Sequence, residues 1–322
     1  MAKVALISVV IPAYRPEDFS CLLQSMANNT DPIVEWIVVD DGSGPQFDEV
    51  FATLPATVML IRQAANQRQG AARNVGLAAA SGQWVKFLDA DDQLDNGHLS
   101  ALYSSIHTDR VRVLPFAPTL HVYPSGKTML NDSWRDLPVE SSAQFRRQLV
   151  RPFVHHCGVL FPRKLLLQLG GYDENLVTDE DGDLLLRVLR QGYYFKPVES
   201  INYLYIHRLG GGRVSSDDDI SKFQARVTVC RKVLGSYSNG IPVLEAEALA
   251  QRMDQIALSY WKSYPLEARK LLTEARSIAP DYKADARALF KLMRRVVGVG
   301  PSLSLIAAYR RLRGRPAGGA QG

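Results

Sequence analysis

The chain has 322 residues, of which 46% are hydrophobic and 22% charged, the composition of a globular protein that buries a core without disulfides. Its three cysteines lie far apart and form no CxxC pair, so neither a zinc ribbon nor a disulfide framework is indicated, and a reducing, cytoplasmic setting is expected. Eight basic residues and no acid follow position 286. Subtracting these eight from the net charge of +5 leaves −3 for the rest of the chain, so no nucleic-acid partner is expected.

The first hundred residues alternate between short apolar runs and amphipathic or alanine-rich stretches. The apolar runs predict strands, and the other stretches predict helices. In chain order the predicted elements are a strand over 4–11, a helix over 17–28, strands over 34–39 and 57–61, a helix over 69–80 and a strand over 83–88. This order predicts an α/β fold, with a mostly parallel sheet flanked by helices.

Two acidic turns, 40–41 and 89–92, follow predicted strands of this sheet. Such sheets bind ligands outside the carboxyl ends of their strands, which is where both turns are expected. Three aspartates within four residues repel one another unless a cation or hydrogen bonds compensate them, and Mg2+ or Mn2+ takes such oxygen ligands. A solvated acidic turn is the alternative. An EF-hand is excluded, because Gln93 and Leu94 occupy the fifth and sixth loop positions.

The chain beyond residue 95 is less regular up to about residue 215. It predicts a helix over 95–106 capped by Asp95, a hairpin over 119–129, a strand over 153–161, helices over 163–169 and 178–190, and strands over 193–198 and 201–207. The helix over 178–190 opens with acids, which the helix dipole favours at that end, so capping alone is an alternative to a functional role. From 217 to 296 the pattern is helical throughout.

The turn after the first strand argues against several classes of enzyme. It reads Pro12-Ala13-Tyr14-Arg15-Pro16, which cannot form the GxGxxG cradle of a dehydrogenase. The chain also contains no P-loop, HExxH or GxSxG motif. A sugar nucleotidyltransferase would show a glycine-rich, basic loop at this turn, so that alternative ranks low.

Six segments carry a resemblance to a known family. They are SVVIPAY at 8–14, VVDDGS at 38–43, GAARNVG at 70–76, FLDADD at 87–92, LGGYDE at 169–174 and EDGDLLLR at 180–187. In order and spacing the first four resemble the motifs of inverting family 2 glycosyltransferases with the GT-A fold, and the last two resemble that family's acceptor-side segment. The resemblance implies a catalytic domain over 1–215, with a nucleotide-sugar half to about 95 and an acceptor half from about 96. Residues 216–322 would form a helical extension with a basic tail.

On the donor side, the resemblance implies a pocket for a nucleotide-sugar, with a UDP-sugar as the expected donor. Asp40 would face the base with Asp41 beside it, and the pocket would be lined by Pro12, Ala13 and Tyr14. Arg73 matches the family's basic residue near the nucleotide, and the alternative is a surface arginine on an alanine-rich helix.

The resemblance also identifies the turn 89–92 as a DxD motif that binds Mn2+ or Mg2+. Asp91 would be the direct metal ligand, and Asp89 would contribute to the metal site and lie nearer the ribose. Asp92 is expected to shape the turn. His207 is a further candidate near the diphosphate and the metal, with a purely structural role as its alternative.

On the acceptor side, Asp181 aligns with the family's catalytic base and is preceded by Glu180. A carboxylate near the acceptor hydroxyl would take its proton, and attack from the face opposite the diphosphate would invert the anomeric centre. A divalent cation and Arg73 would stabilise the charge that builds on the leaving diphosphate. The pair His155-His156 has no counterpart in the resemblance and is expected in the core or at the rim of the site.

The expected acceptor is a saccharide or a lipid-linked saccharide, as in cell-surface polysaccharide synthesis. The basic, partly apolar segments 287–297 and 303–309 suggest peripheral contact with the inner face of a membrane, and the alternative is a helix pair packed on the domain.

The main rival function is a non-catalytic nucleotide-sugar binder. Acids at 89, 91 and 181 argue against it, because a binder needs no base.

Overall fold

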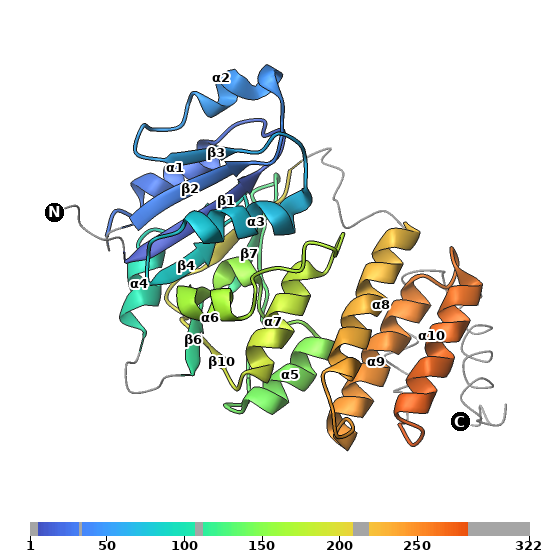
Figure 1. The fold of residues 1–322 in the computed structure, drawn as a ribbon. Coiled ribbons are helices and arrows are strands. Elements are labelled where there is room, and N and C mark those ends of the chain that lie inside the picture. The colour runs from blue at the N-terminus through green and yellow to red at the C-terminus, as the bar shows by residue number, and fades with distance from the viewer. Residues whose placement is uncertain (1–5, 32–33, 107–111, 209–218, 283–322) are drawn as a thin grey trace. The chain divides into compact units, whose positions relative to one another are not determined.

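The computed structural model of the protein describes residues 6–31, 34–106, 112–208 and 219–282 (Figure 1). The chain divides into two compact units, Met1–Gly212 and Arg213–Gly322, next to the boundary expected after residue 215. None of the helices in the described ranges has the length and the apolar character needed to cross a bilayer. The basic tail from residue 287 lies outside the described ranges.

A five-stranded sheet of order β3-β2-β1-β4-β9 organises the first unit. Its strands are β1 (Ile7–Ala13), β2 (Val34–Asp40), β3 (Met59–Arg62), β4 (Trp84–Phe87) and β9 (Leu160–Pro162). The first four run parallel, and β9 pairs with β4 antiparallel. Every residue of β1 is buried, as expected for a central strand covered on both faces. The predicted α/β class is confirmed, with one antiparallel strand at the edge.

The helices of this half are α1 (Ser20–Ala27), the short α2 (Asp48–Phe51) and α3 (Arg68–Ala79). Helix α3 packs on β1 and β2 (Figure 1). Its approach needs a glycine, because a Cβ at Gly76 would lie 2.3 Å from Val10 Cγ1. The turn after β2 needs one too: Gly42 has a φ of 72°, and a Cβ there would lie 2.5 Å from the backbone of Ala65. Two glycines of the recognised motifs therefore have steric causes.

A four-stranded sheet stands beside the acidic turn, in the order β5-β11-β7-β8. Its strands are β5 (Gln93–Leu94), β7 (Thr119–Val122), β8 (Thr128–Leu130) and β11 (Tyr203–Ile206). The expected hairpin is present as the antiparallel pair of β7 and β8. Two further strands, β6 (Val113–Phe116) and β10 (Tyr194–Pro197), pair in parallel.

The remaining helices of this unit are α4 (His98–Ser104), α5 (Ser141–Val150), α6 (Arg163–Gln168) and α7 (Glu180–Arg190). Asp95 does not cap α4: Gly97 occupies the N-cap, and Asp95 Oδ2 instead accepts a hydrogen bond from Asn202 N at 2.7 Å. The strand expected over 153–161 is largely wrong. Residues 153–155 are irregular, a 3-10 turn spans His156–Gly158, and only the end of the range belongs to β9. A backbone hydrogen bond from Gly158 N to His155 O closes this turn.

The described part of the second unit is helical. It contains α8 (Ile220–Gly235), α9 (Val243–Ser259) and α10 (Pro265–Ile278), with α9 in contact with both of the others. Asp219 caps α8, since its side chain accepts a hydrogen bond from Ser221 N at 2.9 Å.

Candidate active site

The aspartates of the turn 89–92 face different partners. Asp92 is 2% exposed and accepts hydrogen bonds from the Tyr203 hydroxyl and, at 2.8 Å, from Ile206 N. Burial, followed by the nearby charge of Asp89, raises the pKa of Asp92 well above its ordinary value. Asp92 therefore fastens the turn to β11, in line with the shaping role expected of it.

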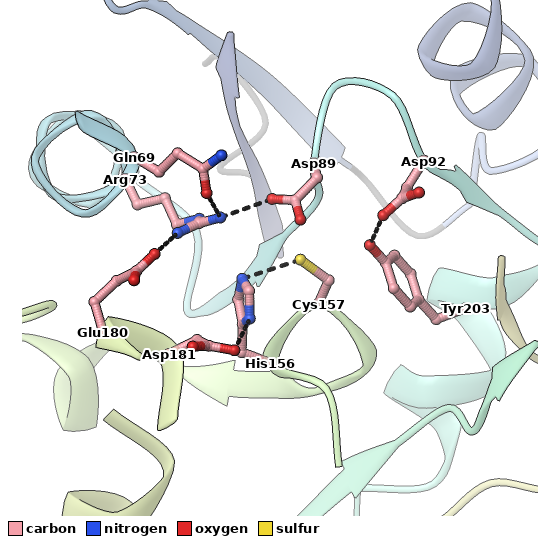
Figure 2. Close-up of polar contacts among 9 residues, drawn as sticks. All are labelled: Gln69, Arg73, Asp89, Asp92, His156, Cys157, Glu180, Asp181 and Tyr203. Carbon is pink, nitrogen blue, oxygen red and sulfur yellow. Dashed lines mark hydrogen bonds and ion pairs between the residues drawn. The ribbon is translucent and has the colours of Figure 1, made fainter. Parts of the chain in front are cut away.

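Asp89 points the other way, toward α3, and Figure 2 shows it facing Arg73. Its Oδ1 accepts a hydrogen bond from Arg73 Nη2 at 2.8 Å. Burial is the largest single influence and would raise the pKa of this carboxyl, but the charge of Arg73, the neighbouring His156 and His155 and the hydrogen bond from Arg73 together lower the pKa to about 2. Asp89 is therefore ionised at neutral pH.

Arg73 joins the two acidic segments of the site. Its guanidinium is 1% exposed and donates to Asp89, to Glu180 Oε1 at 3.0 Å and to Gln69 Oε1 at 3.0 Å (Figure 2). It also lies 5.3 Å from the ring centre of Tyr172. The surface-arginine alternative is wrong, because this residue is buried at the centre of the site.

Helix α7 brings the second pair of acids to the same place. It starts after Asp179, whose left-handed φ of 64° turns the chain into the helix. Glu180, 14% exposed, contacts Arg73, while Asp181, 36% exposed, lies beside His156, with Oδ2 3.5 Å from Nδ1. Burial would raise the pKa of Asp181, but the close contact with His156 Nδ1 opposes burial, and the pKa lies well below its ordinary range.

The histidine pair contributes more to the site than the sequence suggested. His156 is 3% exposed, and its Nε2 lies 3.1 Å from Cys157 Sγ. The ring of His155 stacks on Tyr203 with 5.0 Å between ring centres, and burial, followed by the neighbouring His156, lowers the pKa of His155 to about 3. The sequence carried a signal in the form of adjacent His-His-Cys before an apolar run, but no motif assigned it a partner.

Asp40 and Asp41 shape the loops around the predicted nucleotide pocket. Asp40 Oδ1 accepts a hydrogen bond from Ser43 N at 2.9 Å, and Asp41 Oδ1 accepts one from Gln67 N at 2.7 Å. Both are buried, at 3% and 2% exposure, and burial raises the pKa of Asp41. The role of Asp40 toward a base stays a prediction.

The segment Pro12-Ala13-Tyr14 crosses the end of β1. Pro12 and Ala13 are buried within the strand, whereas Tyr14 follows it and is 43% exposed. The guanidinium of Arg15 lies 5.0 Å from the Tyr14 ring centre. Of these three residues, Tyr14 presents the most surface to a ligand.

His207 lies in an aromatic cluster at the end of β11. Its Nε2 is 3.1 Å from His121 Nδ1, and its ring stacks on Tyr123 with 4.2 Å between ring centres. These contacts provide a structural role for His207, and its role at a metal stays a prediction.

The acidic turn fits a cation that is shared with a substrate. Asp91 is exposed, and Asp89 Oδ2 accepts no hydrogen bond from the described residues. Among the described residues, the carboxylates of the turn do not converge as a closed cage, and the convergent potential ligands are instead His155, His156 and Cys157. Mg2+ and its relatives commonly use one or two carboxylates together with substrate phosphates and water. Asp91 with Asp89 supplies such a donor set.

Comparison with known proteins agrees with the fold and the motifs. The model of the family described as "Glycosyl transferase family 2" matches residues 8–170. An uncharacterised glycosyltransferase of Haemophilus influenzae is 27% identical over 63% of the chain and 69% of its own length. The succinoglycan biosynthesis protein ExoO of Rhizobium meliloti is 26% identical over 95% of the chain and 88% of its own length. Other matches are shorter, such as one spanning 39% of a second Haemophilus influenzae glycosyltransferase.

Among solved structures, the S. aureus protein TarS, residues 1–349 in complex with UDP-GlcNAc, is similar with a TM-score of 0.63. The two share 18% sequence identity, and the similarity covers 95% of this chain and 85% of the TarS chain. At this identity the likeness shows the fold, and the predicted GT-A architecture is confirmed.

Proposed function

We infer the chemistry from one premise: the chain belongs to glycosyl transferase family 2, and it is therefore a glycosyltransferase. We propose that it moves a sugar from a nucleotide-diphosphate donor, a UDP-sugar, to a hydroxyl of a saccharide or lipid-linked saccharide. The reaction inverts the configuration at the anomeric carbon. The proposed setting is cell-surface polysaccharide synthesis, which the similarity to a succinoglycan biosynthesis protein supports.

One observation carries the proposal, namely that two acidic segments converge on Arg73. Asp89 follows β4 and Glu180 opens α7, 107 residues after Arg73, yet both contact the same guanidinium. A nucleotide-sugar held at the turn 89–92 would therefore lie next to the helix that carries Asp181. Donor-binding and proton-accepting groups need such proximity to act in one step.

The proposed metal, Mn2+ or Mg2+, would be held by Asp91 and Asp89 together with the donor diphosphate. Bound there, it would supply Lewis-acid stabilisation of negative charge on the leaving diphosphate. His207 is retained as a further candidate ligand. Arg73 is already balanced by two carboxylates, so we assign it mainly the task of ordering Asp89 and Glu180.

In the proposed reaction the acceptor oxygen forms a bond to the anomeric carbon. The bond from that carbon to the diphosphate oxygen breaks, and its electron pair leaves with the nucleoside diphosphate. Asp181, held next to the acceptor hydroxyl, accepts its proton. Its low pKa means that the carboxyl is ionised at neutral pH and carries no proton of its own. The base and the leaving group act on opposite faces of the sugar, which gives inversion.

Thermal unfolding with nucleoside diphosphates and nucleotide-sugars, with and without Mn2+, tests the proposal. A ligand at 100 times its dissociation constant stabilises the folded state by about 2.7 kcal/mol. We expect a UDP-sugar to raise the melting temperature most in the presence of Mn2+. Asp91→Asn should lose the Mn2+-dependent part, whereas Asp132→Asn, which changes an exposed acid in another loop, should keep it. No Mn2+-dependent shift with any nucleotide would overturn the proposal.

A further inference from the structure

Two side chains, His156 and Cys157, follow one another behind the proposed base Asp181, as Figure 2 shows. Cys157 Sγ lies 3.1 Å from His156 Nε2, and His156 Nδ1 lies 3.5 Å from Asp181 Oδ2. Asp181 is 36% exposed, His156 3% and Cys157 0%. The imidazole therefore stands between a carboxylate at the edge of the site and a thiol in the core.

Packing holds this imidazole in place. Its ring centre lies 6.4 Å from that of Phe87, 5.9 Å from that of Tyr172 and 4.7 Å from that of His155. Among the described residues, no group makes a hydrogen bond of good geometry to Nδ1, and the Asp181 carboxylate is the charged group beside it. A buried donor without a partner costs about 1–3 kcal/mol, so a proton on Nδ1 is drawn to Asp181. Such contacts are often long in the free enzyme and shorten when substrate binds.

The thiol decides which ring nitrogen carries the proton. Burial raises the pKa of Cys157 well above its ordinary value, so the sulfur keeps its hydrogen. A thiol that donates to Nε2 makes that nitrogen an acceptor. A neutral imidazole has one donor and one acceptor nitrogen, so its own proton is then on Nδ1, facing Asp181.

We propose that His156 is a positioning residue for the base: its Nδ1–H holds Oδ2 of Asp181, leaving Oδ1 for the acceptor hydroxyl, and Cys157 fixes the tautomer. The proposal rests on the proposed role of Asp181. Neither His156 nor Cys157 forms a bond to substrate, and neither gains or loses a proton in the transfer.

Other titratable groups surround this pair and contribute to its electrostatics. His155 adjoins it, Asp89 and Arg73 lie across the site, and Glu180 is next to Asp181. Against the opposing influence of burial, the contact with His156 Nδ1 is the largest cause of the low pKa of Asp181. Removing the Nδ1 donor should therefore raise that pKa.

Replacing His156 by asparagine or by glutamine distinguishes the effect of the Nδ1 hydrogen-bond donor from the effect of losing the imidazole ring. The side-chain nitrogen of His156→Asn can occupy the region of Nδ1, whereas that of His156→Gln reaches toward the region of Nε2. Turnover is measured as nucleoside diphosphate released from whichever nucleotide-sugar gives the largest thermal shift. We expect His156→Asn to retain most of kcat. His156→Gln should lose about tenfold or more and move the acidic limb of the pH–rate profile upward, with the donor KM unchanged. Equal kcat values and equal pH profiles in the two variants would overturn the proposal.

A second measurement needs no substrate and no folded His156 variant. Nitrogen-15 NMR of the imidazoles in the unliganded protein reports the tautomer of His156. We expect Nδ1–H in the wild type and in Cys157→Ser, whose hydroxyl also donates, and a mixture of tautomers in Cys157→Ala. An Nε2–H imidazole in the wild type would overturn the inference. Since this readout involves no turnover, it fails separately from the proposed function, which Asp181→Asn kinetics tests.

Discussion

The hydroxyl of Tyr203 donates a hydrogen bond to the buried carboxylate of Asp92, and this bond ties the acidic turn to β11. The other Asp92 oxygen accepts from Ile206 N at 2.8 Å, so β11 uses both oxygens. Asp89 is instead bound from α3 by Arg73. Asp89 and Asp92, which flank Asp91 in the turn, are thus held by different elements, and the side chain of Asp91 is left exposed to solvent.

Replacing Tyr203 by phenylalanine should destabilise the fold. Asp92 would keep one hydrogen bond and lose the other in a buried place, which costs about 1–3 kcal/mol. Urea denaturation measures the change. Tyr103→Phe is the control: among the described residues its hydroxyl has no partner, and its change should stay within about 0.5 kcal/mol. Equal losses in the two variants would refute the anchoring role of Tyr203.

Removing Arg73 should cost more than removing one hydrogen bond. Arg73→Met leaves the carboxylates of Asp89 and Glu180, 22% and 14% exposed, without their counter-charge, and breaking such a pair costs about 3–5 kcal/mol. Arg73→Lys should rescue little, because one ammonium cannot reproduce the planar fork that reaches both acids. Chemical denaturation measures each variant. The double variant Arg73→Met with Glu180→Gln should recover part of the loss, and a larger, additive loss would contradict the pairing.

Asp181→Asn should separate binding from chemistry. An amide of the same shape leaves the donor site intact but cannot accept the acceptor proton, so turnover should fall by about 10²–10⁴-fold. The nucleotide-sugar thermal shift should persist, which shows that the site is still formed. Unchanged turnover in this variant would exclude Asp181 as the base.

The stability of the protein should rise between pH 7 and 9 because of Lys86, which is fully buried in β4 and donates to the Cys157 carbonyl. Burial lowers its pKa from 10.5 to about 7. In this window the unfolded chain therefore binds a proton that the folded protein does not, and stability increases with pH by up to about 1.4 kcal/mol per unit.

The free energy of unfolding measured across this range for wild type and Lys86→Met checks the prediction. The variant should show a flatter curve, because the titrating amine is gone. Lys196→Met, which changes an exposed lysine on β10, should leave the slope as it is. Parallel curves for wild type and Lys86→Met would show that Lys86 does not cause the rise.

The nucleotide half of the fold follows from its sequence because local signals there agree with the tertiary contacts. The apolar run of β1 is buried throughout, and the predicted helix over 69–80 is α3, shifted by one residue. The acids 40–41 and 89–92 lie at strand ends as predicted. In this half, hydrophobic periodicity and turn residues were sufficient to predict the positions of the strands, the helix and the acidic turns.

The region around His156 could not be predicted because non-local contacts decide it. The apolar run 153–161 favours a strand, but at Gly158 the chain passes so close to Ala117 that a Cβ would lie 2.6 Å from its carbonyl oxygen. A turn forms there instead and brings His156 to Asp181. Similarly, the burial of Arg73 depends on Glu180, a partner 107 residues away that helix periodicity does not indicate.

The antiparallel pairing of β4 with β9 makes residues 88–159, which include the first part of the acceptor half, an insertion in the sheet. The chain leaves β4 at Phe87 and returns at Leu160, which pairs with Lys86 in the neighbouring strand, so exit and return are about one strand spacing apart. The entropic cost of closing a loop rises only by about 0.6 kcal/mol per doubling of its length. The segment between β4 and β9 can therefore become longer or shorter at little cost in loop closure. In a chain built this way, substrate range can diversify through changes within this one insertion, while Asp89 and His156, which lie near its two ends, keep their places.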